Sequence, residues 1–306
     1  MKITIAGGTG FIGKELVNHF TKKGDKVLVL GRSCNPKDNN STTDYSVWDG
    51  QTLGDWVEKI KGTDVLINLT GKSVDCRYTE ENKRLILESR TNSVEVLEKA
   101  FLQVNEQPKV WLNASTATIY RDEYESPNDE FSTRIGEGFS VKVAKAWEGA
   151  LDNVNFTKTR KIKLRITIVL GKNGGAFPVF KKLVKFGAGG RQGNGKQKFS
   201  WIHMHDLVQI IDLCVENKNI SGPINCSAPE TVTNSSFMKE LRKQLKMPFG
   251  IPTPKFLLIL GTKIIGTEPE LILKSRWVFS KKLQDLGFKF KFGTLEEGIS
   301  ELTTKD

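Results

Sequence analysis

The stretch that decides the fold is KITIAGGTGFIG, residues 2–13 of a chain of 306. It opens with an apolar run typical of a short buried strand, and the glycine-rich segment Gly7–Gly13 follows without a break. Residues 14–23 then carry apolar side chains at helical spacing, and 27–30 form a second apolar run. A strand, a glycine turn, a helix and a strand within about thirty residues predict a βαβ unit with parallel strands.

The alternation of strands and helices continues downstream. Apolar runs predict strands at 64–69, 109–114 and 162–170, and helical spacing predicts helices at 79–105 and 138–153. Strands that are apolar throughout are typical of parallel sheets covered by helices on both faces. The sequence therefore predicts an α/β fold, a Rossmann-like doubly wound parallel sheet.

The glycine-rich segment has the spacing of a dinucleotide-binding turn. Gly8–Gly13 fits G-x-G-x-x-G, whose glycines allow a tight turn, close approach to a pyrophosphate, and contact between helix and strand. The N–H groups and the positive dipole end of the next helix then face the phosphates. A P-loop is excluded because Glu15 stands where a magnesium-binding Ser or Thr is needed. The expected pyrophosphate-binding residues are Gly7, Gly8, Thr9, Gly10, Phe11, Ile12 and Gly13.

The residue at the end of the second strand indicates which dinucleotide binds. NAD-binding units place Asp or Glu about twenty residues after the glycines, where it accepts a hydrogen bond from the ribose 2′-hydroxyl. This chain has Arg32 there instead, and a guanidinium suits the 2′-phosphate of NADP. NADP(H) is therefore the predicted cofactor, with a solvated surface arginine as the alternative.

The composition argues against several other classes of function. The net charge is +11, but the basic residues are spread along the chain without a basic block, so we expect no nucleic-acid partner. No apolar run reaches the roughly 18 residues of a transmembrane helix, and we see no signal peptide. We therefore expect no membrane partner and a cytoplasmic location. Metal binding is not expected, because the four cysteines form no C-x-x-C pair and the three histidines are badly spaced for a cluster.

Further motifs extend along nearly the whole chain. They are GGTGFIG at 7–13, Trp48-Asp49, NLTGKSV at 68–74, Arg77-Tyr78-Thr79, Trp147-Glu148, Arg165 with Gly171 and Gly174-Gly175, FSWIHMHDL at 199–207, and LGFKFKF at 286–292. By these motifs the chain resembles the atypical extended short-chain dehydrogenase/reductases, in the sugar-nucleotide epimerase-like family. The resemblance implies a Rossmann-like NADP-binding domain, predicted at 1–232 with substrate-cleft segments after about 172, and a small C-terminal α/β lobe at 233–306.

The resemblance also implies which residues surround the ligands. The residues implied to line the cofactor are Arg32, Trp48, Asp49, Leu69, Thr70 and Gly71, with Trp48 and Asp49 near the adenine. Arg77 and Ser115 are expected to contact it as well, with an exposed ion pair as the alternative for Arg77. His203 and Asp206 lie at the turn that lines the cleft in this family. His203 is expected either to donate a hydrogen bond to the substrate or to be a structural, hydrogen-bonded histidine. The glycine-rich loop 191–198 is expected to be a mobile lid over the substrate.

The chain departs from the family at the catalytic pair. The family has a Ser or Thr at a strand end and then Tyr-x-x-x-Lys, in which the tyrosine is the acid/base and the lysine lowers its pKa. Thr116 takes the first position, but the tyrosine and lysine positions fall on Ser140 and Ala144. A serine hydroxyl is a far weaker acid than a phenol, and alanine carries no charge. The candidate catalytic residues are thus Thr116 and Ser140, and the nearby substitutes are Lys142, Lys145 and Tyr120.

Two functions from different classes remain open. The first is an NADP(H)-dependent oxidoreductase or epimerase-like enzyme acting on a hydroxyl or carbonyl carbon of a small-molecule substrate, for example a nucleotide sugar. The second is a non-catalytic NADP(H)-binding sensor or regulatory protein. The residues at 140 and 144 favour the second, and the cleft motif at 199–207 favours the first. The sequence leaves both a monomer and a homodimer open.

Overall fold

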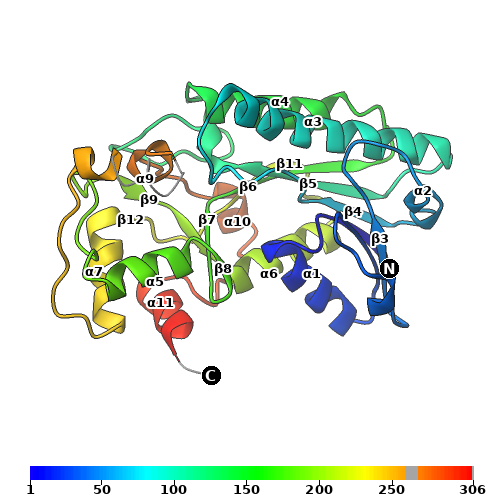
Figure 1. Cartoon of the computed structure of the whole chain (residues 1–306). Helices are drawn as coiled ribbons and strands as arrows, with labels where there is room; N and C mark the ends of the chain where they lie inside the picture. Colours follow the sequence, from blue (N-terminus) through cyan, green and yellow to red (C-terminus); the bar gives the residue numbers. More distant parts are fainter. Residues whose placement is uncertain (260–267, 305–306) are drawn as a thin grey trace.

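The computed structural model describes residues 1–259 and 268–304, and its centre is a seven-stranded parallel sheet (Figure 1). The strands are β1 (Lys2–Ala6), β2 (Lys26–Gly31), β3 (Thr43–Val47), β4 (Val65–Asn68), β5 (Val110–Thr116), β6 (Arg160–Ile166) and β11 (Gly222–Cys226). Their order is β11-β6-β5-β4-β1-β2-β3, and all neighbours run parallel. The order reverses between β1 and β4, where sheets of this kind bind ligands at the carboxyl ends of the strands. The predicted Rossmann-like fold is confirmed.

Helices cover both faces of the sheet. α3 (Glu80–Gln103) and α4 (Phe139–Asn153) lie on one face, and α1 (Phe11–Lys22) and α6 (Met204–Glu216) on the other (Figure 1). Successive residues of β2 alternate between these faces. Val29 packs in the core cluster that contains α1 and α6, whereas Leu28 and Leu30 pack in the cluster that contains α3 and α4. Because both faces are buried, the central strands are apolar throughout.

A second lobe begins where the chain leaves the sheet. The predicted strand 162–170 is wrong as a single strand, because Thr167 separates β6 from β7 (Ile168–Gly171). The Thr167 N–H and hydroxyl both donate to the Cys226 carbonyl, at 3.2 and 2.8 Å. β7 instead pairs with β10 (Trp201–His203) and β8 (Gly174–Gly175) in a three-stranded sheet.

The remaining elements of the chain are short. They are β9 (Lys198–Phe199) with β12 (Val232–Thr233), and the helices α2 (Trp56–Lys59), α5 (Phe177–Lys185), α7 (Asn234–Gln244), α9 (Glu270–Leu273), α10 (Lys281–Asp285) and α11 (Leu295–Thr303). β7 and β9 precede residue 232 and α7 follows it, and they lie in the same lobe (Figure 1). The predicted boundary at 232 stays a prediction.

The segment 275–279 connects the two lobes. The Arg276 N–H donates to the Lys198 carbonyl of β9 at 2.9 Å. On the opposite side, the Asn128 N–H donates to the Trp277 carbonyl at 2.8 Å. The segment therefore lies between β9 and the loop that follows β5.

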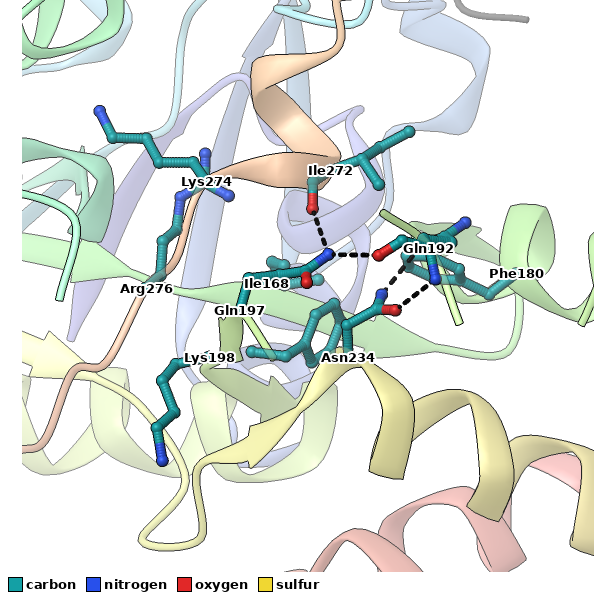
Figure 2. A pocket seen from close by; sticks show the side chains of 10 residues that line it. Ile168, Phe180, Gln192, Gln197, Lys198, Asn234, Ile272, Lys274 and Arg276 are labelled. Atoms are coloured by element: carbon teal, nitrogen blue, oxygen red, sulfur yellow. Dashed lines mark hydrogen bonds between the residues drawn. The ribbon is translucent and has the colours of Figure 1, made fainter. Parts of the chain in front are cut away.

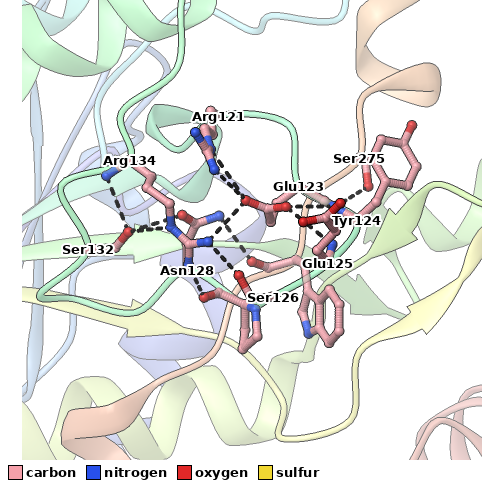
Figure 3. Close-up of polar contacts among 11 residues, drawn as sticks. Arg121, Glu123, Tyr124, Glu125, Ser126, Asn128, Ser132, Arg134 and Ser275 are labelled. Atoms are coloured by element: carbon pink, nitrogen blue, oxygen red, sulfur yellow. Dashed lines mark hydrogen bonds and ion pairs between the residues drawn. The ribbon is translucent and has the colours of Figure 1, made fainter.

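That loop is held by a cluster of polar contacts (Figure 3). The Glu123 carboxylate accepts hydrogen bonds from Arg121 and Arg134, each at 3.1 Å. The Ser275 hydroxyl donates to the Glu123 carbonyl at 2.7 Å, which joins the cluster to the C-terminal segment. The loop after β5 and the C-terminal segment at Ser275, which are far apart in the sequence, are thus joined next to the end of β5.

Candidate functional site

The glycine turn between β1 and α1 tolerates no side chain at several positions. Gly7 has a φ of +79°, and its N–H donates to the Leu30 carbonyl at 2.8 Å. A Cβ on Gly13 would lie 2.5 Å from the Gly7 oxygen. A Cβ on Gly8 would lie 2.8 Å from the Val29 side chain. These contacts give the motif glycines the roles that the sequence predicted for a tight turn and for close packing of helix on strand.

The N-terminus of α1 is open to an anion. Gly10 is the N-cap, and no side chain of the described residues caps the first N–H groups. The first turn also contains no acidic residue. Unpaired N–H groups and the positive end of the helix dipole therefore point from the carboxyl edge of the sheet into the space above it. This arrangement fits the pyrophosphate of a dinucleotide.

Phe11 connects the glycine turn to the second lobe. Cβ atoms on Gly171, Gly174 and Gly175 would lie 2.7, 2.5 and 2.7 Å from atoms of the Phe11 ring. The three glycines of the β7–β8 hairpin therefore leave the space that the ring fills. This packing explains the glycine pair at 174–175, and a contact between Phe11 and the cofactor stays a prediction.

Arg32 lies at the carboxyl end of β2, directly after Gly31. Its side chain is exposed and has no partner among the described residues. The preceding Gly31 packs against the Thr9 side chain, since a Cβ there would lie 2.8 Å from Thr9 Oγ1. Arg32 thus follows a residue that contacts the glycine turn, and its guanidinium can meet a ligand without breaking an ion pair among the described residues.

Trp48 and Asp49 follow β3, next to a pocket of about 440 Å³. The Trp48 ring is buried against Trp56, with ring centres 5.6 Å apart. The Asp49 carboxylate accepts hydrogen bonds from the Gln51 and Thr52 N–H groups, both at 2.8 Å. Burial alone would raise the pKa of Asp49, but these hydrogen bonds outweigh it and lower the pKa. Asp49 therefore shapes the turn, and a role beside the adenine stays a prediction.

The turn after β4 lies beside the glycine turn. The Leu69 N–H donates to the Ala6 carbonyl at 2.9 Å, and a Cβ on Gly7 would lie 3.3 Å from the Leu69 carbonyl carbon. The Thr70 hydroxyl is buried and has no hydrogen-bond partner in the described part of the chain. A ligand at this edge of the sheet would provide one.

Arg90 holds the same turn in place, a role that the sequence analysis did not predict. Its guanidinium packs on Gly71, donates to the Lys72 and Ile86 carbonyls at 3.0 and 2.8 Å, and lies 4.9 Å from the Trp147 ring centre. Burial lowers the pKa of Arg90 to about 10. Nothing in the sequence marked Arg90, because its spacing is that of any polar residue on a helix.

Arg77 forms the ion pair that was its alternative role. Its guanidinium lies 3.6 Å from the Glu268 carboxylate, which also accepts from the Tyr78 N–H at 2.8 Å. Glu268 lies far along the chain, close to α9. The contact joins the β4–α3 loop to the C-terminal segment, and contact of Arg77 with the cofactor stays a prediction.

Ser115 belongs to a buried polar network at the end of β5. Its hydroxyl donates to the Glu148 carboxylate at 2.7 Å, and Arg165 pairs with both oxygens of that carboxylate at 2.8 Å. Burial tends to raise the pKa of Glu148, but the Arg165 hydrogen bond and charge lower it. Arg165 also donates to the buried Tyr120 hydroxyl at 2.8 Å. Tyr120 therefore packs in this network, and the Ser115 hydroxyl is directed into it.

Thr116 is the last residue of the same strand and is half-buried. Its hydroxyl accepts from the Thr118 N–H at 3.1 Å and donates to the Thr118 hydroxyl at 2.9 Å, so it caps the short helix η2 (Ala117–Ile119). A bound oxygen could take the place of the Thr118 hydroxyl as the acceptor.

Ser140 and Ala144 lie on the first turns of α4. The Ser140 hydroxyl donates to the carboxylate of Glu270, at the start of α9. Ala144 is fully buried. Lys142 and Lys145 are exposed, so neither ammonium group takes the position of the missing lysine.

His203 and Asp206 anchor the C-terminal part of the chain. The His203 ring nitrogens bond to the Glu301 carboxylate and the His205 N–H, both at 3.1 Å, and Asp206 accepts from the Lys291 N–H at 2.9 Å. Burial lowers the pKa of His203 against the opposing effect of Glu301. These contacts agree with the alternative in which His203 is a structural, hydrogen-bonded residue.

Buried amides enclose a small cavity in the second lobe (Figure 2). Gln197 donates to the Gln192 carbonyl at 2.9 Å, and Asn234 donates to the Gln192 side chain at 3.0 Å. The cavity measures about 10 Å³, about the room that one water needs. Basic side chains at its wall are Lys198, Lys274 and Arg276. The mobile lid expected at 191–198 stays a prediction.

Among residues 1–259 and 268–304, no group of three or more His, Cys, Asp or Glu side chains is placed to hold a metal ion. Within the same described residues, no helix has the length and apolar character needed to cross a membrane.

Two family models match separate parts of the chain. Residues 3–227 match the NAD dependent epimerase/dehydratase family, and residues 253–302 match a domain of unknown function, DUF1731. The epimerase family protein YfhF of Bacillus subtilis is 34% identical over 99% of this chain and 98% of its own. The epimerase family protein SH2119 of Staphylococcus haemolyticus is 31% identical over 97% of both chains.

Solved structures share the fold over the whole chain. The human epimerase family protein SDR39U1, crystallised with NADPH, has a TM-score of 0.88 and 26% identity over 99% of both chains. A nucleoside-diphosphate sugar epimerase from Corynebacterium glutamicum has a TM-score of 0.78 and 25% identity, covering 99% of this chain and 58% of that one. MoeE5, in complex with UDP-glucuronic acid and NAD, has a TM-score of 0.78 at 18% identity and shows a shared fold alone. The family resemblance predicted from the motifs is confirmed.

Proposed function

Because the chain belongs to the NAD dependent epimerase/dehydratase family, we propose that it binds NADP(H) and acts as an oxidoreductase or epimerase-like enzyme. Its substrate would be a small molecule that reacts at a hydroxyl or carbonyl carbon. The observation that carries the proposal is the open N-terminus of α1 above three glycines that admit no side chain.

The residues around that helix end support a dinucleotide in an extended pose. Gly10 and the first N–H groups of α1 would hold the pyrophosphate. The buried Thr70 hydroxyl, unpartnered among the described residues, would gain an acceptor or donor on the ligand. The pocket beside Trp48 and Asp49 would take the adenine.

The choice of NADP(H) over NAD(H) rests on Arg32. Arg32 is exposed at the end of β2, directly after a residue that packs on the glycine turn, and its guanidinium has no partner within the described chain. It would meet a 2′-phosphate with charge-assisted hydrogen bonds. The human SDR39U1 structure contains NADPH, whereas MoeE5 was solved with NAD.

The substrate would lie beyond the carboxyl ends of β4 and β5. A bound nicotinamide cofactor would supply or accept the hydride there. Thr116 would orient the reacting oxygen by exchanging its hydrogen bond with Thr118.

A non-catalytic NADP(H) sensor is the second candidate. The observation that favours it is the first part of α4, where Ala144 is fully buried and Lys142 and Lys145 face solvent. No lysine of that helix therefore lies where it could lower the pKa of an acid/base.

The binding step is tested with Gly10→Asp, and Gly10→Ala is the matched control. Gly10 has an extended backbone, with φ −77° and ψ 178°, in which aspartate is a favoured N-cap. The carboxylate would bond the free N–H groups and repel the phosphates. We expect Gly10→Asp to keep or raise the free energy of unfolding and to weaken NADPH binding by about 100-fold or more. Gly10→Ala adds bulk without charge where the backbone approaches the pyrophosphate, so it should weaken binding less than Gly10→Asp does. No NADPH binding by the wild type would refute the proposal.

Catalysis is tested separately by following NADPH oxidation and NADP⁺ reduction with nucleotide sugars and simple carbonyl compounds. We expect little or no turnover of ordinary nucleotide sugars, because Tyr-x-x-x-Lys is missing. Robust epimerisation of a UDP-sugar would contradict this expectation. NADPH binding without turnover on any substrate class would favour the sensor.

A further inference from the structure

Tyr78 contains a buried polar group that the site described above does not use. The residue lies in the β4–α3 loop, and its phenol oxygen is buried without a hydrogen-bond partner among the described residues. Buried polar groups in native proteins are nearly always hydrogen-bonded, so an exception at a ligand-binding edge needs a reason. One such reason would be that the phenol donates its hydrogen bond to a ligand when the ligand is bound.

The ring of Tyr78 is fixed without help from its hydroxyl. Its main-chain N–H donates to Glu268 at 2.8 Å. Its ring packs edge-on against Phe139, the first residue of α4, with ring centres 5.0 Å apart and planes at 68°. The C-terminal segment thus holds the main chain of Tyr78, α4 packs against its ring, and neither contact uses the phenol oxygen.

The surroundings keep the phenol protonated. Removal from water raises the pKa of Tyr78, and the Glu270 carboxylate adds to the rise. The Ser140 hydroxyl opposes the shift but makes no well-aligned hydrogen bond with the phenol, and its own proton is donated to Glu270. At neutral pH Tyr78 is therefore a hydrogen-bond donor.

The position of the phenol matches the edge where the reaction would occur. Tyr78 follows β4, and Ser140 lies on the first turn of α4, whose buried Ala144 packs against Ala117 just after the end of β5. Thr116 ends β5 at the same edge. The loop after β4 and the start of α4 therefore bring Tyr78 and Ser140 together beside the carboxyl ends of these two strands.

We propose that Tyr78 is the acid/base of this protein, placed in the β4–α3 loop beside Ser140. This inference rests on the proposed function. In the reducing direction, a carbonyl carbon that accepts the hydride of bound NADPH leaves the electron pair of its C=O bond on oxygen. The phenol O–H bond breaks and its proton goes to that oxygen, which leaves the alcohol and a phenolate. Water returns a proton to the phenolate at the end of the turnover.

A phenol at the reaction centre must respond to the charge of the nicotinamide. The oxidised ring is positive and the reduced ring is neutral. Two unit charges within about 10 Å, at an effective dielectric of about 20, change a pKa by about one unit or more. The pKa of Tyr78 should therefore be lower with NADP⁺ than with NADPH, in the direction that lets the phenol be regenerated as a base for alcohol oxidation.

The experiment is ¹⁹F NMR of the full chain containing 3-fluorotyrosine, titrated with pH in the presence of saturating NADP⁺ or NADPH. The chain has four tyrosines, and the Tyr78 resonance is assigned by its loss in Tyr78→Phe. We expect the Tyr78 pKa to be about one unit or more lower in the NADP⁺ complex. Tyr45 is the matched control, because burial also raises its pKa but it lies in β3, on the adenine side. Its pKa should be equal in the two complexes.

Tyr78→Phe also separates a catalytic from a structural role. The variant removes an oxygen that has no partner among the described residues, so its urea midpoint and its NADPH affinity should equal those of the wild type. Equal Tyr78 pKa values in both complexes, or a lower urea midpoint for Tyr78→Phe, would overturn the proposal while leaving NADP(H) binding intact. Failure of the wild type to bind either form would overturn the proposed function instead, and this inference with it.

Discussion

Replacement of Arg32 by aspartate should reverse the choice of cofactor. The guanidinium is exposed and has no partner in the described part of the chain, so contact with a phosphate breaks no existing ion pair. Each charge-assisted hydrogen bond to a 2′-phosphate contributes roughly 1.5–3 kcal/mol. With 1.4 kcal/mol per ten-fold, and with salt screening of an exposed site, one or two such bonds predict about a 10–10³-fold preference for NADPH over NADH. A carboxylate at the same place would repel the phosphate and accept from the bare 2′-hydroxyl.

The measurement is a titration of wild type and variants with both reduced cofactors, followed by nicotinamide fluorescence at low and high salt. Lys37→Asp is the matched control, because it makes the same change of charge at an exposed position five residues further along the chain. We expect Arg32→Asp to erase or reverse the preference and Lys37→Asp to leave it nearly unchanged. Equal affinity of the wild type for NADPH and NADH would show that Arg32 does not bind the phosphate. If Lys37→Asp changed the preference as much as Arg32→Asp, the effect would come from the overall charge of the surface and not from a contact of Arg32.

Three further outcomes follow from the residues around β5. Arg165→Met leaves the buried Glu148 carboxylate unpaired and should lower the free energy of unfolding by about 3–5 kcal/mol. The double variant Arg165→Met, Glu148→Met should recover much of that loss in urea titrations. If the losses of the two single variants simply added in the double variant, the pairing would be contradicted. Because the pKa of Glu148 is lowered in the folded state, its stabilising effect is present above the unfolded pKa of about 4.3 and is lost as pH falls through the folded pKa. Glu148→Gln should therefore lose less stability than the wild type between pH 5 and 3. An equal loss in both proteins would show that Glu148 does not cause the pH dependence. With any active substrate, Thr116→Ala should lower kcat by ten-fold or more at unchanged NADPH affinity, and an unchanged kcat would remove Thr116 from the mechanism.

The sequence predicted the part of the fold whose signals are local. The β1–α1–β2 unit combines an apolar run, glycines and helical spacing within one short stretch, and it forms as expected. β3 was missed because Thr43–Val47 is a polar edge strand without a continuous apolar run. The strand expected at 162–170 divides at Thr167, because that residue bonds to Cys226 in a distant strand and turns the chain into the second lobe.

The candidate site shows the same limit. The glycine turn could be derived from spacing because it is built from consecutive residues. The contact of Ser140 with Glu270 spans 130 residues, and that of the Tyr78 N–H with Glu268 spans 190. No local sequence pattern can predict contacts between residues so far apart. Arg90 was missed for a related reason. A buried arginine that packs on a glycine and donates to main-chain carbonyls has no sequence signature.

The contacts of the C-terminal segment explain why two family models occur together on this chain. The region matched by the epimerase/dehydratase family ends at residue 227, yet Glu268, Glu270 and 275–279 all lie in the region matched by DUF1731. Glu268 bonds the Tyr78 N–H, Glu270 accepts from Ser140, and 275–279 pairs with both β9 and the loop after β5. Without these residues the β4–α3 loop and the start of α4 would lose polar partners that no neighbour in the first region supplies within the described chain. The glycine turn and the open N-terminus of α1 therefore lie within the region matched by the epimerase/dehydratase family, whereas the loop after β4 and the start of α4 are held in part by residues of the C-terminal region.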